Sequence, residues 1–471
     1  MKKTKIIATI GPASSDYETL KQIIEAGANV VRLNMSHGSH EEQMERVLKV
    51  RKINEELNSA VGILLDTKGP EVRTGEFKEG TVFEAGSIVR LVNDDIVGDN
   101  TAFSVSYKGL AKDLKVGDII LLDDGYVSVQ VKEIDNQDLI CEVLNTGEMK
   151  DRRGVNVPGV TLNFEFISPK DEDDIIWACE NNYDYIAASF VRNKQDALEL
   201  RDVIAKTGNT NIKLLAKIES QDGVENFDEI LEVCDGIMIA RGDLGVEIPA
   251  EDVPAIQRMI IDKCNKQGKI VITATQMLES MQHNPRPTRA EVSDVFNAVL
   301  SGTDAVMLSG ESAAGDYPVE AVCMQAKICE KAEESFSYDN YNQKIFKNLD
   351  NSIQELVAYS VTSTAAKLPG AKLIIAITNS GATAKSISRM KPALPILAIT
   401  HNEDVRRGLS LNYGVLGVAT EKLDSLDASL DEAVKIAKQM GIVEPGDTVI
   451  ISAGSIEGKG NTDLMKVRVV N

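Results

Sequence analysis

The chain has 471 residues, of which 43% are hydrophobic and 26% are charged, and its formal net charge is −21 at pH 7. This balance is typical of a globular protein with more than one domain, and so acidic a chain is a poor partner for nucleic acid or an anionic membrane surface. If the substrate is an anion, the site must gather cations locally, from side chains or from metal ions.

Neither membrane insertion nor a disulfide framework is expected. No stretch approaches the ~20 apolar residues that span a bilayer, and the opening MKKTKIIATIGPAS is typical of a strand rather than a signal peptide. Six dispersed cysteines form no CxxC pair, which favours reduced, buried thiols in a cytoplasmic protein.

Eight short apolar runs, each followed by a helix-like segment, predict an α/β protein with a parallel sheet. They are KIIATIG (5–11), NVVRLNMSHG (29–38), AVGILLDTKG (60–69), YIAASF (185–190), KLLAKIE (213–219), GIMIARGD (236–243), KIVITATQ (269–276) and DAVMLSGE (304–311). Eight units over about 250 residues favour a closed (β/α)8 TIM barrel; an open doubly wound sheet is the alternative. Residues 16–27 and 288–302 are predicted helices, the second capped by Thr288 with Glu291 at its third position.

Two other regions depart from this rhythm. Between the third and fourth runs, β-branched stretches alternate with the hairpin signals DDG, DNQD and NTG, which predicts a small inserted β-barrel domain. After the polar stretch 335–352, five further apolar runs indicate a separate C-terminal α/β domain. We therefore expect a barrel at 1–69 and 166–345, an inserted lid at 70–165 and a C-terminal domain at 346–471.

Polar residues end at least six of the eight predicted barrel strands, where a TIM barrel carries its active site. Residues two apart on a strand share a face. The predicted sets on one face are Arg32, Asn34 and Ser36; Lys217 and Glu219; Arg241 and Asp243; Thr273 and Thr275. Asp66 and Thr67 end the third strand, and Ser309, Gly310 and Glu311 end the eighth.

The residue types in these sets suit chemistry on an anion. Carboxylates such as Glu219 and Asp243 are ligands for Mg²⁺, which usually fills its other positions with water and phosphate. Lys217 and Arg32 are cations suited to phosphoryl oxygens. Each charged pair, considered alone, is also explained by an ordinary salt bridge at the end of a strand. The polar residues at several strand ends together favour electrostatic catalysis, with phosphoryl transfer as the leading case.

The stretch IMIARGDLG (237–245) predicts an anion site next to these carboxylates. Gly242 allows a ligand close to the backbone. The residues that follow, with Pro249 and Glu251, are expected to open a short helix whose N–H groups bind an anion.

These motifs are similar to those of a known family, and the sequence resembles pyruvate kinase along its whole length. The matching motifs are RLNMSHG (32–38), LDTKGPEVRTG (65–75), SPKD (168–171), ASF (188–190), AKIE (216–219), GIMIARGDLGVEIP (236–249), ATQMLESM (274–281), PRPTRAEVSDVFNAV (285–299) and LSGESA (308–313). That family combines a barrel, an inserted β domain and a C-terminal α/β domain. It transfers the phosphoryl group of phosphoenolpyruvate to ADP, giving pyruvate and ATP.

The resemblance also implies roles for individual residues. Glu219 and Asp243 would hold Mg²⁺, and Lys217 would stabilise the phosphoryl group in transfer. The substrate carboxylate and enolate would be held by the N–H groups of Gly242 and Asp243 with the Thr275 hydroxyl, and the phosphate by Arg32. The nucleotide would be contacted by Arg32, Asn34, His37, Arg73 and Arg153, and K⁺ would be bound by Asn34, Ser36, Asp66 and Thr67.

Three further expectations follow from the resemblance. Glu71 occupies a position where an acidic residue accompanies K⁺ dependence, so activity without K⁺ is expected to be low. Family members are usually tetramers, and helix 288–302 is a candidate interface. The proton donor to the enolate stays open between Thr275 and a water relay.

A phosphorylated effector is expected at the C-terminal domain. The candidate residues are Thr378, Asn379, Ser380, Gly381 and Thr383, which follow an apolar strand and open a helix-like stretch, with 454–463 as a second loop. Ile456 and Glu457 stand there in place of a basic residue, which leaves fructose 1,6-bisphosphate, AMP and a sugar monophosphate as alternatives. The alternative interpretation is an ordinary capped turn between a strand and a helix, with no effector bound.

Two rival functions are distinguishable. A barrel lyase or aldolase that stabilises an enolate with Mg²⁺ needs the same carboxylate pair but no ADP. A metabolite sensor without catalysis predicts the loss of Lys217, Glu219 or Asp243, and all three are present.

Overall fold

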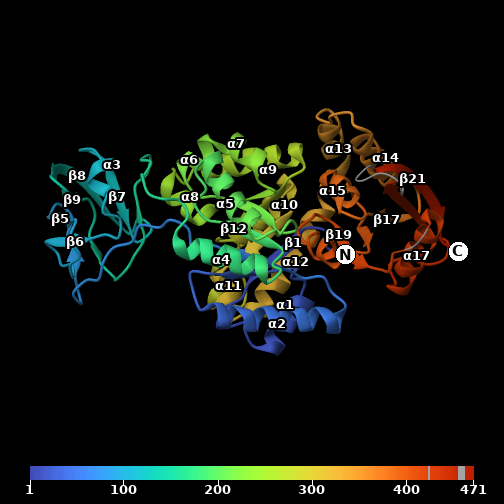
Figure 1. Ribbon diagram of the computed structural model, residues 1–471, viewed down its shortest axis with the longest axis horizontal. Coiled ribbons are helices and arrows are strands. Elements are labelled where there is room, and N and C mark those ends of the chain that lie inside the picture. Colours follow the sequence, from blue (N-terminus) through green and yellow to red (C-terminus); the bar gives the residue numbers. More distant parts are fainter. Residues whose placement is uncertain (423–424, 455–461) are drawn as a thin grey trace.

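The computed structural model of the protein describes residues 1–422, 425–454 and 462–471. Figure 1 shows an elongated molecule with the barrel in the middle, the inserted β region at one end and the C-terminal α/β region at the other. This arrangement leaves the two ends of the central barrel facing different neighbours.

Within residues 5–308, which are described without a gap, eight parallel strands close into a barrel in the order β1-β16-β15-β14-β13-β12-β3-β2. Their bounds are β1 (Lys5–Thr9), β2 (Val30–Asn34), β3 (Gly62–Asp66), β12 (Tyr185–Ala188), β13 (Lys213–Ile218), β14 (Gly236–Ala240), β15 (Ile270–Ala274) and β16 (Ala305–Leu308). The closed TIM barrel is confirmed and the open sheet is excluded. The strands read as continuous apolar runs because each is covered on both faces.

Helices surround this barrel. They are α1 (Tyr17–Glu25), α2 (His40–Leu57), α4 (Pro169–Glu180), α5 (Lys194–Lys206), α6 (Gln221–Glu225), α7 (Phe227–Val233), α8 (Arg241–Glu247), α9 (Val253–Gln267), η1 (Glu279–Gln282), α10 (Arg289–Ser301), α11 (Gly310–Ala313) and α12 (Pro318–Glu334). Both predicted amphipathic segments are helices, and Thr288 with Glu291 forms the predicted capping box of α10. Along the described residues, no helix combines the length and apolar composition that a bilayer crossing needs.

The inserted region, described throughout, folds as β-sheet around a core that includes Phe77, Phe83 and Phe103. Its elements are β4 (Val82–Phe83), β5 (Ile88–Val92), β6 (Ala102–Ser104), α3 (Leu110–Asp113), β7 (Ile119–Leu122), β8 (Val127–Asp135), β9 (Asp138–Val143), β10 (Gly147–Glu148) and β11 (Val155–Asn156). Six of these strands pair in the order β11-β7-β8-β9-β5-β6, and β10 pairs with β4.

The described part of the C-terminal region contains a sheet in the order β19-β18-β17-β20-β21, in which β21 is antiparallel to β20. The elements are α13 (Tyr338–Phe346), α14 (Ile353–Lys367), β17 (Ala371–Ile377), α15 (Ala382–Arg389), β18 (Ile396–Thr400), α16 (Glu403–Arg407), β19 (Val415–Ala419), α17 (Leu426–Gln439), β20 (Thr448–Gly454) and β21 (Thr462–Val469). This is the separate α/β unit that the sequence predicts.

The C-terminal unit seals the end of the barrel at which the strands begin. Leu411, between α16 and β19, belongs to the same buried cluster as the inward-facing barrel residues. Tyr185 at the start of β12 accepts a hydrogen bond from the Leu411 N–H at 3.2 Å, and the buried Lys391 forms an ion pair with Asp304. Any site inside the barrel must therefore open at the carboxyl ends of the strands.

Candidate active site

Lys217 lies at the carboxyl end of β13 and faces two carboxylates. Its Nζ is 2.9 Å from Glu219 Oε1 and 3.1 Å from Asp66 Oδ1. All three side chains are buried. Burial lowers the pKa of Lys217, but Asp66 and Glu219 outweigh burial and raise that pKa above its usual value. Lys217 therefore stays cationic at neutral pH, and the shared face predicted for Lys217 and Glu219 is observed.

Among its described neighbours, Glu219 keeps one oxygen without a well-aligned hydrogen bond despite its ion pair with Lys217. Its Oε2 accepts the Phe190 N–H at 2.6 Å, whereas Oε1, among the residues that the structure describes, receives no well-aligned hydrogen bond. Burial raises the pKa of Glu219 to about 8, and Asp243 adds to the increase against the opposing effect of Lys217. A carboxylate pair short of positive charge is a donor set that fits a divalent cation.

Arg32 on β2 completes the ion cluster from the other side. Its Nε lies 2.6 Å from Asp66 Oδ2, and its Nη1 donates to Thr9 Oγ1 at 3.0 Å. Burial raises the pKa of Asp66, but Arg32 and Lys217 overcome this and hold that pKa below its usual value. Strands distant in sequence thus bring two cations and two carboxylates into one connected cluster.

The prediction that Arg241 and Asp243 share a strand face is wrong. Strand β14 ends at Ala240 and α8 begins at Arg241, and residues two apart on a helix point in different directions. Arg241 turns away from the mouth and pairs with Asp294 of α10 at 2.7 Å, while Asp243 lines the cavity beside the mouth. The short helix predicted after Gly242 is α8, which begins at Arg241 and ends at Glu247, so Pro249 and Glu251 lie beyond it.

The prediction that Thr273 and Thr275 share a face is also wrong. Ile272 and Ala274 of β15 face the barrel interior, so Thr273 points outward, where it bonds Thr303 Oγ1 at 3.1 Å. Thr275 lies beyond the strand in the left-handed region, with φ of 66°. This turn brings its Oγ1 to the Gly242 N–H, which donates to it at 2.7 Å. Thr275 and Gly242 are therefore together at the mouth, as predicted for the substrate-holding residues.

The four predicted K⁺ ligands lie on two neighbouring strand ends. Asn34 of β2 pairs in register with Asp66 of β3. Asn34 Oδ1 accepts the Ser36 N–H at 3.0 Å, and Thr67 Oγ1 accepts the Ser189 N–H at 3.0 Å. Ser36 itself lies just beyond the strand, because β2 ends at Asn34.

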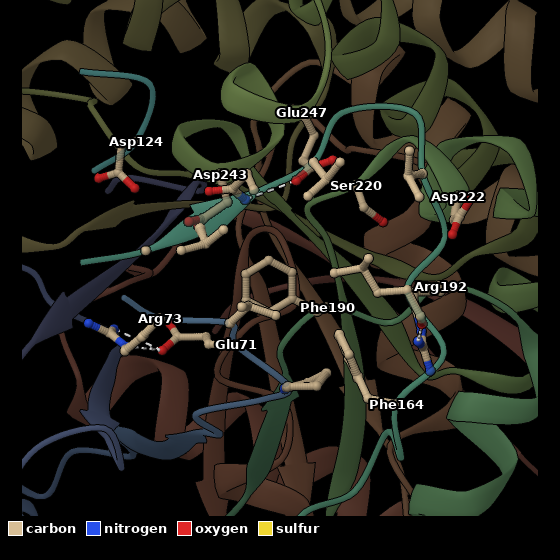
Figure 2. A pocket seen from close by; sticks show the side chains of 18 of the residues that line it. Glu71, Arg73, Asp124, Phe164, Phe190, Arg192, Ser220, Asp222, Asp243 and Glu247 are labelled. Carbon is tan, nitrogen blue, oxygen red and sulfur yellow. Dashed lines mark hydrogen bonds and ion pairs between the residues drawn. The ribbon is translucent and has the colours of Figure 1, made fainter. Parts of the chain in front are cut away.

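A cavity of about 350 Å³ separates the inserted region from the barrel. Figure 2 shows Asp124 and Asp243 above Arg73 and Glu71, with both pairs to the left of Phe190 in this view. The Arg73 and Glu71 side chains are paired at 2.8 Å. The cavity wall thus combines carboxylates and cations from both domains.

The two adjacent arginines at 152 and 153 behave differently. Arg153 lines the cavity, and within the described chain its buried Nε has no hydrogen-bond partner. Arg152 instead pairs with Glu76 at 2.7 Å, where both side chains are exposed. Arg153 therefore lies in the cavity wall, whereas His37 is exposed in the loop after β2 and is not among the residues that line the cavity.

Sequence reasoning passed over two residues that join the site together. Ser189, just after β12, accepts a hydrogen bond from Lys217 Nζ at 2.8 Å and donates to Thr67 O at 2.7 Å. Gly69, with φ of 72°, lies so close to Ser189 that a Cβ added at Gly69 would be 2.6 Å from the Ser189 Cβ. The rule of polar strand ends could have identified Ser189. The hydrogen bond from the Phe190 N–H to Glu219 comes from the backbone, so the pattern of side chains could not predict it.

The candidate effector residues form a strand-to-helix turn after β17. Gly381 is the residue before α15, has φ of 84°, and donates its N–H to Thr378 Oγ1 at 3.0 Å. Thr383 Oγ1 bonds Thr462 Oγ1 at 2.7 Å. The second candidate loop falls mainly on 455–461, outside the described residues. The turn is compatible with both the anion site and the ordinary capped turn.

Two further features concern metals and thiols. Over the described ranges, no cluster of three or more His, Cys, Asp or Glu side chains is arranged for a metal ion, so a site here relies on the pair Glu219 and Asp243 with ligands from elsewhere. All six cysteines, each within those ranges, are free thiols.

Comparison with known proteins gives a consistent result. The family models for the pyruvate kinase barrel domain and the pyruvate kinase α/β domain match residues 1–322 and 355–468. The pyruvate kinase of Clostridium perfringens is 46% identical over 100% of both chains, and that of Bacillus licheniformis is 48% identical over 100% of this chain and 81% of its own. A crystal structure of a pyruvate kinase from Cryptosporidium parvum matches with a TM-score of 0.94 at 40% identity, covering 100% of this chain and 96% of the other.

Proposed function

The chain belongs to the pyruvate kinase family, and we propose that its barrel mouth uses Mg²⁺ and K⁺ to transfer the phosphoryl group of phosphoenolpyruvate to ADP. The observation that carries this proposal is the ion cluster, in which Lys217 Nζ lies 2.9 Å from Glu219 and 3.1 Å from Asp66. Two anionic substrates repel each other, and a cluster of fixed cations at their meeting point offsets that repulsion.

Lys217 has the central role in the proposed transfer. Its raised pKa keeps the ammonium charged, and the surrounding burial strengthens its attraction for phosphoryl oxygens. Arg32 binds the same phosphate from the neighbouring side. Because phosphoryl transfer needs little covalent assistance, positioning and charge supply most of the acceleration.

The substrate carboxylate is proposed to bind at the start of α8. There the N–H groups of Gly242 and Asp243 point out of the first helical turn, which favours an anion. In the structure the Gly242 N–H donates to Thr275 Oγ1 at 2.7 Å, so the bound substrate would replace this contact and leave the Thr275 hydroxyl next to the enolate.

The proposed Mg²⁺ ligands are Glu219 and Asp243. The buried Oε1 of Glu219 and its raised pKa support a cation at this point. When bound, Mg²⁺ would neutralise charge on the phosphoryl group and orient it. The residues' own contribution is to hold two carboxylates in a fixed position before the substrate arrives.

For K⁺, the proposed ligands are the oxygens of Asn34, Ser36, Asp66 and Thr67. The pairing of Asn34 with Asp66 in register supports this set. A lysine at position 71 would supply a fixed cation in the cavity wall, whereas Glu71 does not, which supports a K⁺ requirement.

The proposed nucleotide site is the cavity between the two domains. Arg73 and Arg153 line it, and the proposal adds Arg32 and Asn34 of β2 and His37 in the loop after that strand. The inserted region acts as the lid over ADP in this proposal, with boundaries at 70–165, a barrel at 1–69 and 166–345, and a C-terminal domain at 346–471.

Regulation and assembly are further parts of the proposal. We place a sugar phosphate or AMP at Thr378, Asn379, Ser380, Gly381 and Thr383. We also propose a homotetramer in the cytoplasm. Two exposed apolar surfaces support self-association: α10 exposes Leu300, and the edge strand β21 exposes Met465, Val467 and Val469.

The test is a coupled assay of pyruvate formation from phosphoenolpyruvate and ADP. We expect activity to fall at least about tenfold when either Mg²⁺ or K⁺ is omitted, because each removes charge from the meeting point of two anions. ATP is measured in parallel, since a lyase or aldolase would form none. Full activity in a buffer with neither K⁺ nor Na⁺ would contradict the K⁺ site.

A further inference from the structure

The loop that follows β2, residues 34–37, is held from behind by one buried side chain of α2. Gln43 Nε2 donates to Asn34 O at 3.3 Å and to His37 O at 2.8 Å. Arg46 Nη1 in turn donates to Gln43 Oε1 at 3.0 Å, and Gln43 has no exposed surface. A single carboxamide, fixed in its orientation by Arg46, therefore joins the two ends of the loop.

The interior of the loop is held by contacts of other kinds. Asn34 Oδ1 accepts the Ser36 N–H, and the Met35 N–H donates to Asp66 O, both at 3.0 Å. Lys170 on α4 donates to Met35 O at 3.0 Å. Once Gln43 fixes the ends, these contacts determine where the oxygens of Asn34 and Ser36 point.

We propose that Gln43 is a positioning residue for the monovalent cation, acting through the backbone of the loop that carries Asn34 and Ser36. The inference rests on the proposed function of those two residues as K⁺ ligands. Gln43 touches neither substrate nor cation. Its carboxamide donates to Asn34 O and His37 O, and so adds to the single backbone bond between the loop ends, in which the His37 N–H donates to Asn34 O at 3.3 Å. A hydrogen bond of this kind behind a set of ligands fixes their orientation.

A purely structural role for Gln43 makes a different prediction. If it only packed α2 onto the barrel, its loss would lower stability or the amount of active enzyme without changing the K⁺ concentration required. If it positions the loop, the K⁺ requirement rises while the Mg²⁺ requirement, set by Glu219 just after β13 and Asp243 on α8, stays the same.

The chain provides a spectroscopic signal for this test. Trp177 on α4 is the only tryptophan, and its ring stacks on His40 of α2 with centroids 4.5 Å apart. Melting followed by Trp177 emission therefore reports on the two helices behind the loop. A cation that binds only the folded state raises the melting temperature by an amount that grows with the logarithm of its concentration relative to its dissociation constant, which provides a readout independent of activity.

The experiment compares wild type with Gln43→Met, which keeps the length and burial of the side chain but removes both donors. Each is titrated with K⁺ in tetramethylammonium buffer, once for melting temperature and once for pyruvate formation. We expect an increase of about tenfold both in the K⁺ concentration for half-maximal activity and in the K⁺ concentration that produces a given rise in melting temperature, as for the loss of one well-placed hydrogen bond. The Mg²⁺ concentration at half-activity should not change.

Two further variants serve as matched controls. Ser39→Ala removes the N-cap of the same helix, where Ser39 Oγ accepts the Glu42 N–H at 3.4 Å; it should lower the melting temperature without moving the K⁺ requirement. Gln43→His keeps one N–H donor at similar reach and should give an intermediate K⁺ requirement, which decides the question if Gln43→Met does not fold.

The failures of the two proposals are distinguishable. A wild type whose melting temperature and activity do not respond to K⁺ would overturn the K⁺ site itself, and the inference with it. A wild type that responds, with Gln43 variants whose K⁺ requirement equals that of wild type, would overturn only the role of Gln43.

Discussion

Lys217 illustrates how a residue at the mouth depends on its immediate surroundings. A buried lysine ordinarily loses its proton more easily, yet Asp66 and Glu219 raise the pKa of Lys217 above the usual value. Arg32 in turn holds Asp66 ionised. The charges of Lys217 and Asp66 are therefore maintained by their neighbours, and removal of one member of the cluster changes the protonation of the others.

At this scale we predict that Lys217→Met lowers kcat by a factor on the order of 10²–10³, because it removes a charge aimed at the phosphoryl group. The measurement is the coupled pyruvate assay on protein whose folding is verified by Trp177 emission. Lys213→Met, at the opposite end of the same strand, is the matched control and should retain wild-type kcat. A Lys217→Met enzyme within a few-fold of wild type would remove Lys217 from the mechanism.

At the scale of elements, the ends of strands and helices carry the specific chemistry. Strand β14 passes directly into α8, so Arg241 and Asp243 diverge: Arg241 anchors the turn to α10 through Asp294, while Asp243 faces the cavity. The first turn of α10 is fixed by Thr288 and Glu291, whose backbone and side-chain groups bond each other reciprocally.

For this helix we predict that Thr288→Ala lowers the free energy of unfolding by about 1 kcal/mol, the usual loss for a side-chain N-cap. Thr288 is exposed, and its side chain bonds Glu291 and no member of the ion cluster. The values of kcat and KM should therefore not change. Urea unfolding is the measurement. Thr288→Ser keeps the hydroxyl and should match wild type; equal destabilisation by Ser and Ala would show that the cap contributes nothing.

For the whole molecule, the decisive feature is the contact between the C-terminal unit and the barrel. Leu411 fills the end of the barrel at which the strands begin, and Arg407 pairs with Asp184 at 3.1 Å. At the same surface Lys5, the first residue of β1, donates to Val415 O at 2.5 Å. The contact leaves the opposite end of the barrel as the mouth, next to the inserted region.

Lys5 gives this contact a predicted pH dependence. Burial, assisted by Lys2, lowers the pKa of Lys5 from 10.5 to about 7, against Glu333. Between these values the unfolded chain holds a proton that the folded chain does not, so the Lys5 contribution to stability is present above pH 10.5 and is lost as pH falls through 7.

We therefore expect the melting temperature of wild type, relative to that of Lys5→Met, to rise by roughly 2–4 °C from pH 7 to pH 9. Trp177 emission is the readout, and Lys327→Met, at an exposed position on α12, is the control that should show no such trend. A constant difference between wild type and Lys5→Met across this range would mean that Lys5 keeps its proton in the folded protein.

The sequence alone determined the eight barrel strands, the inserted β region and the C-terminal α/β unit, because strands buried on both faces must be apolar throughout. It also paired Lys217 with Glu219, since residues two apart on one strand share a face. Tertiary structure alone decided that Arg241 points away from the mouth, that Thr275 turns into it, that Ser189 bonds Lys217, and that Gln43 bonds the loop after β2. The periodicity of apolar residues predicts which way a side chain points within a strand or helix. These contacts depend instead on how the chain turns where a strand or helix ends, and on which strands and helices become neighbours.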